Sequence, residues 1–169
     1  MSKLQSLEPS KVFHFFEEIS NIPRTSGNEE AISQYLMSFA KERGLEACQD
    51  KSLNVIIKKG GTEGYEDSYA VIIQGHMDMA GEKSSESTHD FSKDPIELRI
   101  IGDYIYGTDT TLGADNGIAV AYALALLDSD DIAHPPLEVI ITTGEEIGLK
   151  GASALELSTS KAKFLINLD

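Results

Sequence analysis

The sequence predicts an α/β fold with a largely parallel or mixed sheet flanked by helices. Apolar runs of strand length alternate along the chain with segments whose apolar residues recur at helical spacing, which is the order typical of this class. Residues 69–74 and 137–143 are rich in valine and isoleucine, as expected of strands that are buried on both faces. With 169 residues, the chain has about the length of one domain and can bury a hydrophobic core.

The N-terminal part of the chain predicts two helices joined by a loop. Residues 12–19 have the apolar spacing of a short amphipathic helix. Residues 22–28 contain proline, glycine and serine, which indicates a loop. The second helix is expected over residues 29–43, with Ser26 or Asn28 as its capping residue.

The middle of the chain predicts short strands separated by polar segments. Residues 54–58 form a strand that a polar turn connects to the buried run at 69–74. The polar segment 80–94 indicates a long surface loop, and residues 95–101 and 104–106 resemble the two strands of a hairpin.

The C-terminal part returns to the alternating pattern. Residues 117–127 predict a helix of small apolar residues that is suited to packing on a sheet. The buried strand at 137–143 follows, then a short helix at 151–157 and a last strand at 164–168. No apolar run approaches the ~20 residues that are needed to span a bilayer.

Composition excludes several classes of partner. The chain has 14 basic and 28 acidic residues, a net charge of −14, and should therefore repel phosphate backbones and anionic membrane surfaces. We accordingly expect neither nucleic acid nor a membrane as a partner. The single cysteine, Cys48, excludes an internal disulfide, and the N-terminus lacks the apolar segment of a secretory signal. Both features predict a cytoplasmic protein.

Polar residues that can bind metals follow three of the expected strands and open one helix. In chain order they are His76, Asp78, Asp115, Glu145, Glu146 and Asp169. In open α/β sheets, ligand sites lie just beyond the carboxyl ends of the strands. We therefore expect these side chains to gather at one edge of the sheet, although each cluster taken alone also fits a structural turn or a solvated surface.

Crowded carboxylates at that edge would favour a bound cation. Carboxylates in one cleft repel each other, so some must be protonated or must bind a divalent ion. One histidine with several carboxylates suits Zn²⁺, and Mn²⁺ or Co²⁺ less specifically. His76 and Asp78 are two residues apart and so face the same side, where Asp78 can accept a hydrogen bond from the imidazole. Of the adjacent Glu145 and Glu146, one could bind metal and the other could act as a general base on water.

Other catalytic signatures are missing from the sequence. It contains neither of the glycine-rich phosphate-binding motifs, nor His-Glu-x-x-His, nor the Gly-x-Ser-x-Gly of serine hydrolases. The lone Ser-x-x-Lys at residues 158–161 lies in polar surroundings. A metal site would therefore use ligands that are dispersed along the sequence.

Four motifs carry a resemblance to a known family. They are Gly-His-Met-Asp-Met at residues 75–79, Thr-Thr-Leu-Gly-Ala-Asp-Asn-Gly-Ile-Ala at 110–119, Thr-Gly-Glu-Glu-Ile-Gly at 143–148 and Asn-Leu-Asp at 167–169. Together they resemble the co-catalytic zinc peptidases related to carboxypeptidase G and peptidase T. Residues 88–96 favour the bacterial aminoacyl-histidine dipeptidase subfamily. The resemblance covers essentially the whole chain.

The resemblance implies a site with two zinc ions. In it, His76 and Asp169 would bind one ion, Glu146 the other, and Asp115 would bridge the two. No other cofactor is implied, and Mn²⁺ or Co²⁺ could replace Zn²⁺.

It also implies two roles beside the metals. Glu145 would be the general base, and Asp78 would lie behind His76. The peptide bond between Asp115 and Asn116 would be cis, as it often is in relatives.

Members of this family are much longer than this chain. They carry a second domain for lid or dimerisation contacts and then complete the catalytic domain, which supplies a further histidine ligand. Non-ligand roles are expected for the remaining histidines, His14, His89 and His134. We therefore interpret residues 1–169 as the N-terminal part of the catalytic domain, with homodimerisation through the missing domain.

The implied activity is metal-dependent hydrolysis of dipeptides, of the Xaa-His type or with broad specificity, with a dipeptide as the partner. Two alternatives stay open. One is a related two-metal deacylase or tripeptidase, and the other is an inactive, truncated metal-binding fragment. The isolated 169-residue chain is expected to have little or no peptidase activity.

Overall fold

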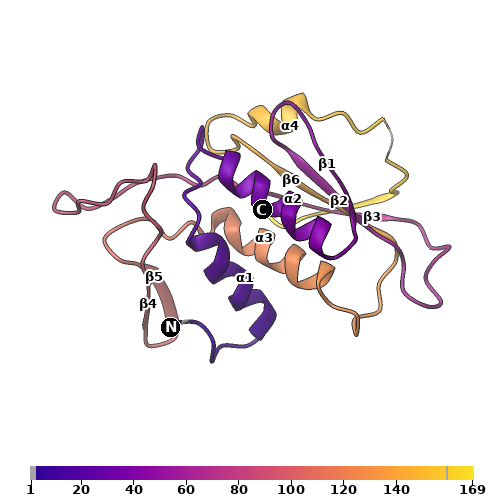
Figure 1. Cartoon of the computed structure of the whole chain (residues 1–169), viewed down its shortest axis with the longest axis horizontal. Helices are drawn as coiled ribbons and strands as arrows, with labels where there is room; N and C mark the ends of the chain where they lie inside the picture. Colours follow the sequence, from indigo (N-terminus) through magenta and orange to yellow (C-terminus); the bar gives the residue numbers. More distant parts are fainter. Residues whose placement is uncertain (1–2, 159) are drawn as a thin grey trace.

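The computed structural model describes residues 3–158 and 160–169 and has the α/β architecture expected from the sequence (Figure 1). In chain order the elements are α1 (Ser10–Ser20), α2 (Glu30–Glu42), β1 (Glu46–Gln49), β2 (Val55–Lys59), β3 (Val71–His76), β4 (Leu98–Ile101), β5 (Tyr104–Gly107), α3 (Ala114–Leu127), β6 (Leu137–Thr142), α4 (Lys150–Ala154) and β7 (Phe164–Asn167). Within the described residues, none of the helices has the length and apolar character that a membrane crossing requires.

The central layer is a mixed sheet with the strand order β1-β2-β6-β3-β7. Strands β3, β6 and β7 run parallel, whereas β1 and β2 are antiparallel to their neighbours. The register pairs His76 with Thr142 and Gln74 with Asn167. Strands β3 and β6 end level with each other and β7 ends two residues earlier, so the residues that follow the three parallel strands emerge at the same edge.

The helices fix this sheet in place. Helix α3 packs on β3, α1 packs along α3, and α2 covers β1 and β2 (Figure 1). The apolar core between them is continuous and includes Phe16 of α1, Leu36 of α2, Leu124 of α3 and Ile141 of β6, each at most 2% exposed. Every residue of β6 is buried, as the valine- and isoleucine-rich sequence predicts for a central strand.

Several elements differ from the sequence-based expectation. Strand β1 was not predicted, because its four residues are polar at both ends and depend on antiparallel pairing with β2. Helix α3 begins at Ala114, three residues early, although Asp115 and Asn116 have non-helical backbone angles. Helix α4 is shorter than expected.

Strand β7 lies at the edge of the sheet and pairs with β3 on one side. Its side chains are largely exposed, with Phe164 at 59%, Leu165 at 56% and Ile166 at 50%. The separate ribbon of β4 and β5 corresponds to the expected hairpin, although β4 begins three residues later than predicted.

Candidate metal centre

The imidazole of His76 is held from one side by Asp78. His76 ends β3 and is 1% exposed. Its Nδ1 lies 3.2 Å from Asp78 Oδ1 and 3.0 Å from the Asp78 carbonyl oxygen. The backbone N–H of His76 donates to Asn116 Oδ1 at 3.1 Å. With Nδ1 engaged in this way, Nε2 is the ring atom that can bind a metal.

Carboxylates from three other segments surround that nitrogen. His76 Nε2 lies 3.2 Å from Asp115 Oδ1, 3.8 Å from Glu145 Oε2 and 3.9 Å from Asp169 Oδ1. One potential ligand atom each from His76, Asp115 and Glu146 falls within 4.8 Å of the others. An imidazole with oxygen ligands at such spacing fits a divalent cation of the zinc, manganese or cobalt type.

Asp78 supports this arrangement from beneath. Its side chain is 0% exposed. Asp78 Oδ2 accepts from Ser26 Oγ at 2.7 Å and from the backbone N–H of Glu146 at 3.3 Å, and Oδ1 accepts from the backbone N–H of Glu145 at 3.1 Å. One carboxylate therefore fixes both the histidine ring and the backbone that carries the two glutamates.

The hydrogen bonds of Asp78 stabilise its ionised form. Burial by itself would raise the pKa, but the hydrogen bonds from His76, Ser26 and the Glu145 backbone outweigh burial and lower the pKa of Asp78 to about 2. Asp78 is thus a permanent anion at neutral pH, which suits a residue that orients a metal-binding imidazole.

The neighbouring groups have their pKa values raised. Burial opposes the charged imidazole, yet the hydrogen bond and charge of Asp78, followed by the charges of Asp169 and Glu145, leave the pKa of His76 above its usual value. The pKa of Glu145 is raised by burial and by the charges of Asp169 and Glu146, against the opposing effect of His76. Without a metal, a proton bound in this cluster offsets part of the negative charge of the carboxylates. A divalent ion would offset that negative charge in place of the proton.

Asp115 is presented by an irregular start of α3. Gly113, which precedes the helix, has a left-handed φ of +70°, and the Asp115–Asn116 peptide bond is cis, as the resemblance implied. The Asp115 side chain is 75% exposed, so it reaches out from the sheet edge. The buried Asn116 also donates from Nδ2 to the carbonyl oxygen of Leu168 at 3.3 Å. It thereby ties the chain after β7 to the start of α3.

Glu145 and Glu146 lie in the turn after β6 and differ in surroundings. Glu146 is exposed, and its Oε1 accepts from the backbone N–H of Ala80 at 3.3 Å. The preceding Gly144 has a φ of +57°, and its N–H donates to Glu29 Oε1 at 3.1 Å. All six residues singled out in the sequence therefore lie in this cluster or directly support it.

Several supporting residues were missed by the sequence analysis. The prediction that Ser26 or Asn28 caps α2 is wrong, because the helix is preceded by Glu29 and has no side-chain cap. Ser26 instead bonds to Asp78, and Arg24 of the same loop is buried beneath the site. The only signal in the sequence was the proline, glycine and serine of residues 22–28. These residues predict a loop but do not indicate which groups its side chains contact.

The remaining histidines lie outside the cluster. His14 is exposed and lies 3.5 Å from Glu18, and the His89 ring packs edge-on against Phe91. His134 Nδ1 contacts the carbonyl oxygen of Pro135 at 2.8 Å.

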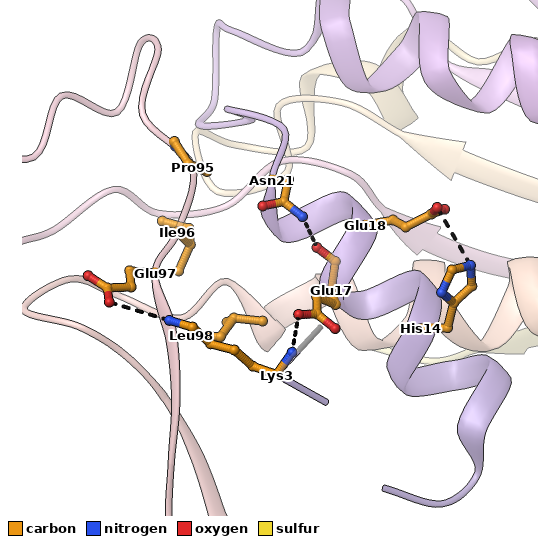
Figure 2. A pocket seen from close by; sticks show the side chains of 9 residues that line it. All are labelled: Lys3, His14, Glu17, Glu18, Asn21, Pro95, Ile96, Glu97 and Leu98. Atoms are coloured by element: carbon orange, nitrogen blue, oxygen red, sulfur yellow. Dashed lines mark hydrogen bonds and ion pairs between the residues drawn. The ribbon is translucent and has the colours of Figure 1, made fainter. Parts of the chain in front are cut away.

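A surface pocket of about 510 Å³ lies between α1 and the segment that leads into β4 (Figure 2). Its charged side chains are paired, with Lys3 Nζ 3.3 Å from Glu97 and His14 3.5 Å from Glu18 (Figure 2). The pocket shares no lining residue with the metal-binding cluster. The cluster is therefore the stronger candidate for the functional site.

Comparisons with known proteins agree with the motifs. No model of a protein family matches the chain. Over 169 residues it is 41% identical to the cytosol non-specific dipeptidase of Escherichia coli K12, with 100% of this chain and 35% of that protein covered. Its structure matches aminoacylhistidine dipeptidase from Vibrio alginolyticus with a TM-score of 0.95 and 42% identity, over 98% of this chain and 34% of that one.

A more distant match is aminopeptidase PepT from Bacillus cereus, with a TM-score of 0.76 and 25% identity over 96% of this chain and 44% of that one. The resemblance drawn from the motifs is therefore confirmed in sequence and in fold. The chain spans about a third of the length of the two dipeptidases that it matches.

Proposed function

Because the chain is similar along essentially its whole length to a cytosol non-specific dipeptidase and to an aminoacylhistidine dipeptidase, we propose that it carries the metal-binding part of a metal-dependent dipeptidase. The observation that carries the proposal is the convergence of His76, Asp115 and Glu146 at the carboxyl edge of the sheet. These residues come from three distant segments, and their ligand atoms lie within 4.8 Å of one another. A solvated acidic surface would not need a buried histidine at its centre.

In this proposal two Zn²⁺ ions bind in the complete site. His76 and Asp169 would hold one ion, Glu146 would hold the other, and Asp115 would lie between them as a bridge. The position of His76 Nε2, 3.2 Å from Asp115 and 3.9 Å from Asp169, supports this assignment. The donor set also admits Mn²⁺ or Co²⁺.

When bound, the ions would polarise the scissile carbonyl group and make water a better nucleophile. Glu145 would accept the proton of the attacking water and then deliver it to the amine that leaves. Its raised pKa supports this role, because a base that must also act as an acid works best with a pKa near the working pH. Asp78 would keep the imidazole and the glutamate backbone in position.

We further propose that the 169 residues supply only part of the catalytic domain. The dipeptidases that they match are about three times as long, so further ligands and substrate contacts would come from outside this region. A lid or dimerisation domain, a homodimeric state and a cytoplasmic location belong to the same proposal.

The substrate would be a dipeptide, with Xaa-His as the preferred type. A tripeptidase or deacylase is the nearest alternative, and the match to aminopeptidase PepT is the observation that favours another peptidase over a deacylase. Both alternatives would use the same metal chemistry.

The test is a hydrolysis assay of a protein that contains this chain within the longer catalytic domain. Xaa-His dipeptides, tripeptides and N-acyl amino acids would be compared with Zn²⁺, with Mn²⁺, and after chelation. We expect metal-dependent hydrolysis of the dipeptides. Turnover confined to N-acyl amino acids would contradict the dipeptidase assignment. Robust zinc-dependent turnover by the 169-residue chain alone would contradict the proposal that its site is incomplete.

A further inference from the structure

We propose that Arg24 is a positioning residue of the metal centre, because its buried guanidinium joins the backbones of the two segments that carry His76 and Asp115. This inference rests on the proposed metal-binding function and assigns a role to the loop between α1 and α2. Arg24 does not contact the ligand atoms themselves. Arg24 would instead fix the distance between the two segments, and so the distance between the ligand atoms of His76 and Asp115.

The contacts of Arg24 connect the two segments directly. Its Nη1 donates to the carbonyl oxygen of Met77 at 3.0 Å, and its Nη2 donates to the carbonyl oxygen of Gly113. Met77 lies between His76 and Asp78, and Gly113 lies two residues before Asp115. One rigid, planar group therefore spans the gap between β3 and the start of α3.

The main chain of Arg24 reinforces the same connection. Its carbonyl oxygen accepts from the N–H of Met79 at 3.1 Å, next to a short parallel bridge between Thr25 and Met79. The segment after β3 is thus bound to this loop through both backbone and side chain.

The glycines around Asp115 leave room for the guanidinium. A Cβ atom placed on Gly113 would lie 2.7 Å from Arg24 Nη2, and one placed on Gly117 would lie 2.5 Å from the same atom. The side chain therefore packs against the backbone on both sides of Asp115. A shift of Arg24 would therefore be felt at that backbone, because glycine has no side chain to separate the two.

A core role alone explains these features poorly. Arg24 is 2% exposed and is the one lysine or arginine among the buried residues that the structure describes. Burial lowers the pKa of Arg24 to about 10, against the opposing charge of Asp78, so the group stays cationic at neutral pH. An apolar side chain would fill the same volume without burying a charge. Two of its donors instead bind the carbonyl groups of Met77 and Gly113, which lie one residue after His76 and two residues before Asp115, whereas its buried Nε has no hydrogen-bond partner among the described residues.

The test compares Co²⁺ binding by the 169-residue chain and by its variants Arg24→Lys and Arg24→Met. Lysine keeps the positive charge but lacks the planar guanidinium group that donates to two carbonyl groups at once. Methionine keeps much of the side-chain volume but has neither the charge nor the donors. Dissociation constants and visible Co²⁺ spectra would be measured, with circular dichroism to verify folding.

Arg43→Lys and Arg43→Met are the matched controls. The side chain of Arg43 is 29% exposed; it lies 3.8 Å from the Phe39 ring centroid and 2.7 Å from Asp128, and neither partner belongs to the metal centre. Its replacement is also expected to lower thermal stability, which would separate general destabilisation from an effect on the metal site.

We expect both Arg24 variants to fold and to bind Co²⁺ at least about tenfold more weakly, with an altered spectrum, while the Arg43 variants stay within about twofold. If Arg24→Met does not fold, Arg24→Lys decides. The proposal is overturned if the folded Arg24 variants bind within about twofold of the unsubstituted chain, if the Arg43 variants lose as much affinity, or if neither Arg24 variant folds. Absence of Co²⁺ binding by the unsubstituted chain would overturn the proposed metal site as well, which distinguishes the two failures.

Discussion

Asp78 is the residue on which the supporting hydrogen bonds of the site converge. It accepts from Ser26 and from the backbone of Glu145 and Glu146, and it contacts Nδ1 of His76. Since Asp78 is fully buried, its charge is tolerated only because these donors surround it. A change at this residue should therefore affect both the stability of the chain and the geometry of the metal ligands.

Replacement of Asp78 by asparagine should lower the free energy of unfolding of the metal-free chain by about 2 kcal/mol at pH 7. The folded pKa of about 2 lies below the unfolded value of 3.8, so the ionised group stabilises the fold above the unfolded pKa. This contribution is lost as the pH falls towards the folded pKa, and it should be roughly half as large at pH 3.

Urea denaturation in the presence of a chelator measures this difference at pH 7, 4 and 3. The exposed Asp67→Asn is the control and should change stability little at any of these pH values. A deficit of Asp78→Asn that stays constant from pH 7 to pH 3 would show that the charge of Asp78 does not stabilise the fold.

Metal binding should depend on pH through His76. Its pKa is raised chiefly because the hydrogen bond and charge of Asp78 outweigh the effect of burial, and a bound metal must displace the proton. Below the His76 pKa, the apparent Co²⁺ affinity should fall about tenfold per pH unit, and binding should release about one proton. Calorimetry in two buffers of different ionisation enthalpy counts the released protons. Affinity that does not change between pH 5 and pH 8 would exclude His76 as a ligand, and His14→Ala should leave the profile unchanged.

At the scale of elements, the parallel strands β3, β6 and β7 decide where the site lies. Their ends were predictable to within about two residues, because valine- and isoleucine-rich runs followed by His76 or Glu145 are visible in the sequence, although β3 ends at His76 and not at residue 74 as expected. The start of α3 was less predictable. Its non-helical residues depend on contacts with Arg24 and with the end of β3, which are remote in sequence. Long-range contacts of this kind leave no local periodic signal.

Gly113 tests this account of the start of α3. Gly113→Ala should destabilise the chain by about 2–4 kcal/mol, because the φ of +70° is unfavourable for alanine and the new Cβ would overlap Met79 and Arg24. Gly27→Ala is the matched control. Gly27 also has a positive φ, of +87°, but faces open space, so only about 1 kcal/mol should be lost. Chemical denaturation compares the two, and equal losses would indicate that the close packing against Arg24 is unimportant.

At the scale of the whole molecule, the exposed apolar edge strand β7 contrasts with a strongly acidic chain. The net charge of −14 keeps copies apart, whereas the exposed apolar residues of β7 favour pairing with another strand. The sequence predicted β7 as a strand but did not indicate its exposure, because Phe164, Leu165 and Ile166 are the residue types expected in a core. The exposure of these side chains depends on which elements pack against β7. The composition of the strand does not specify those elements.

We expect the 169-residue chain to self-associate weakly through β7, and more strongly at high salt, because salt screens the repulsion between copies. Leu165→Lys should reduce this association, since it places a charge on the open edge. Sedimentation velocity across a range of protein concentrations and salt gives the result. The control is Tyr65→Lys, because Tyr65 is an exposed residue in the turn before β3. If both substitutions reduced the association equally, β7 would not be the contact.

The central claim is that side chains from distant segments bind divalent ions together at the edge of the sheet. The most direct test is a crystal of the chain soaked in Zn²⁺, with anomalous scattering used to locate the ions. The account predicts a peak about 2 Å from Nε2 of His76 and from carboxylate oxygens of its neighbours, Asp115 first among them. A map with no ion at this position, or with ions bound only to surface carboxylates elsewhere, would contradict it.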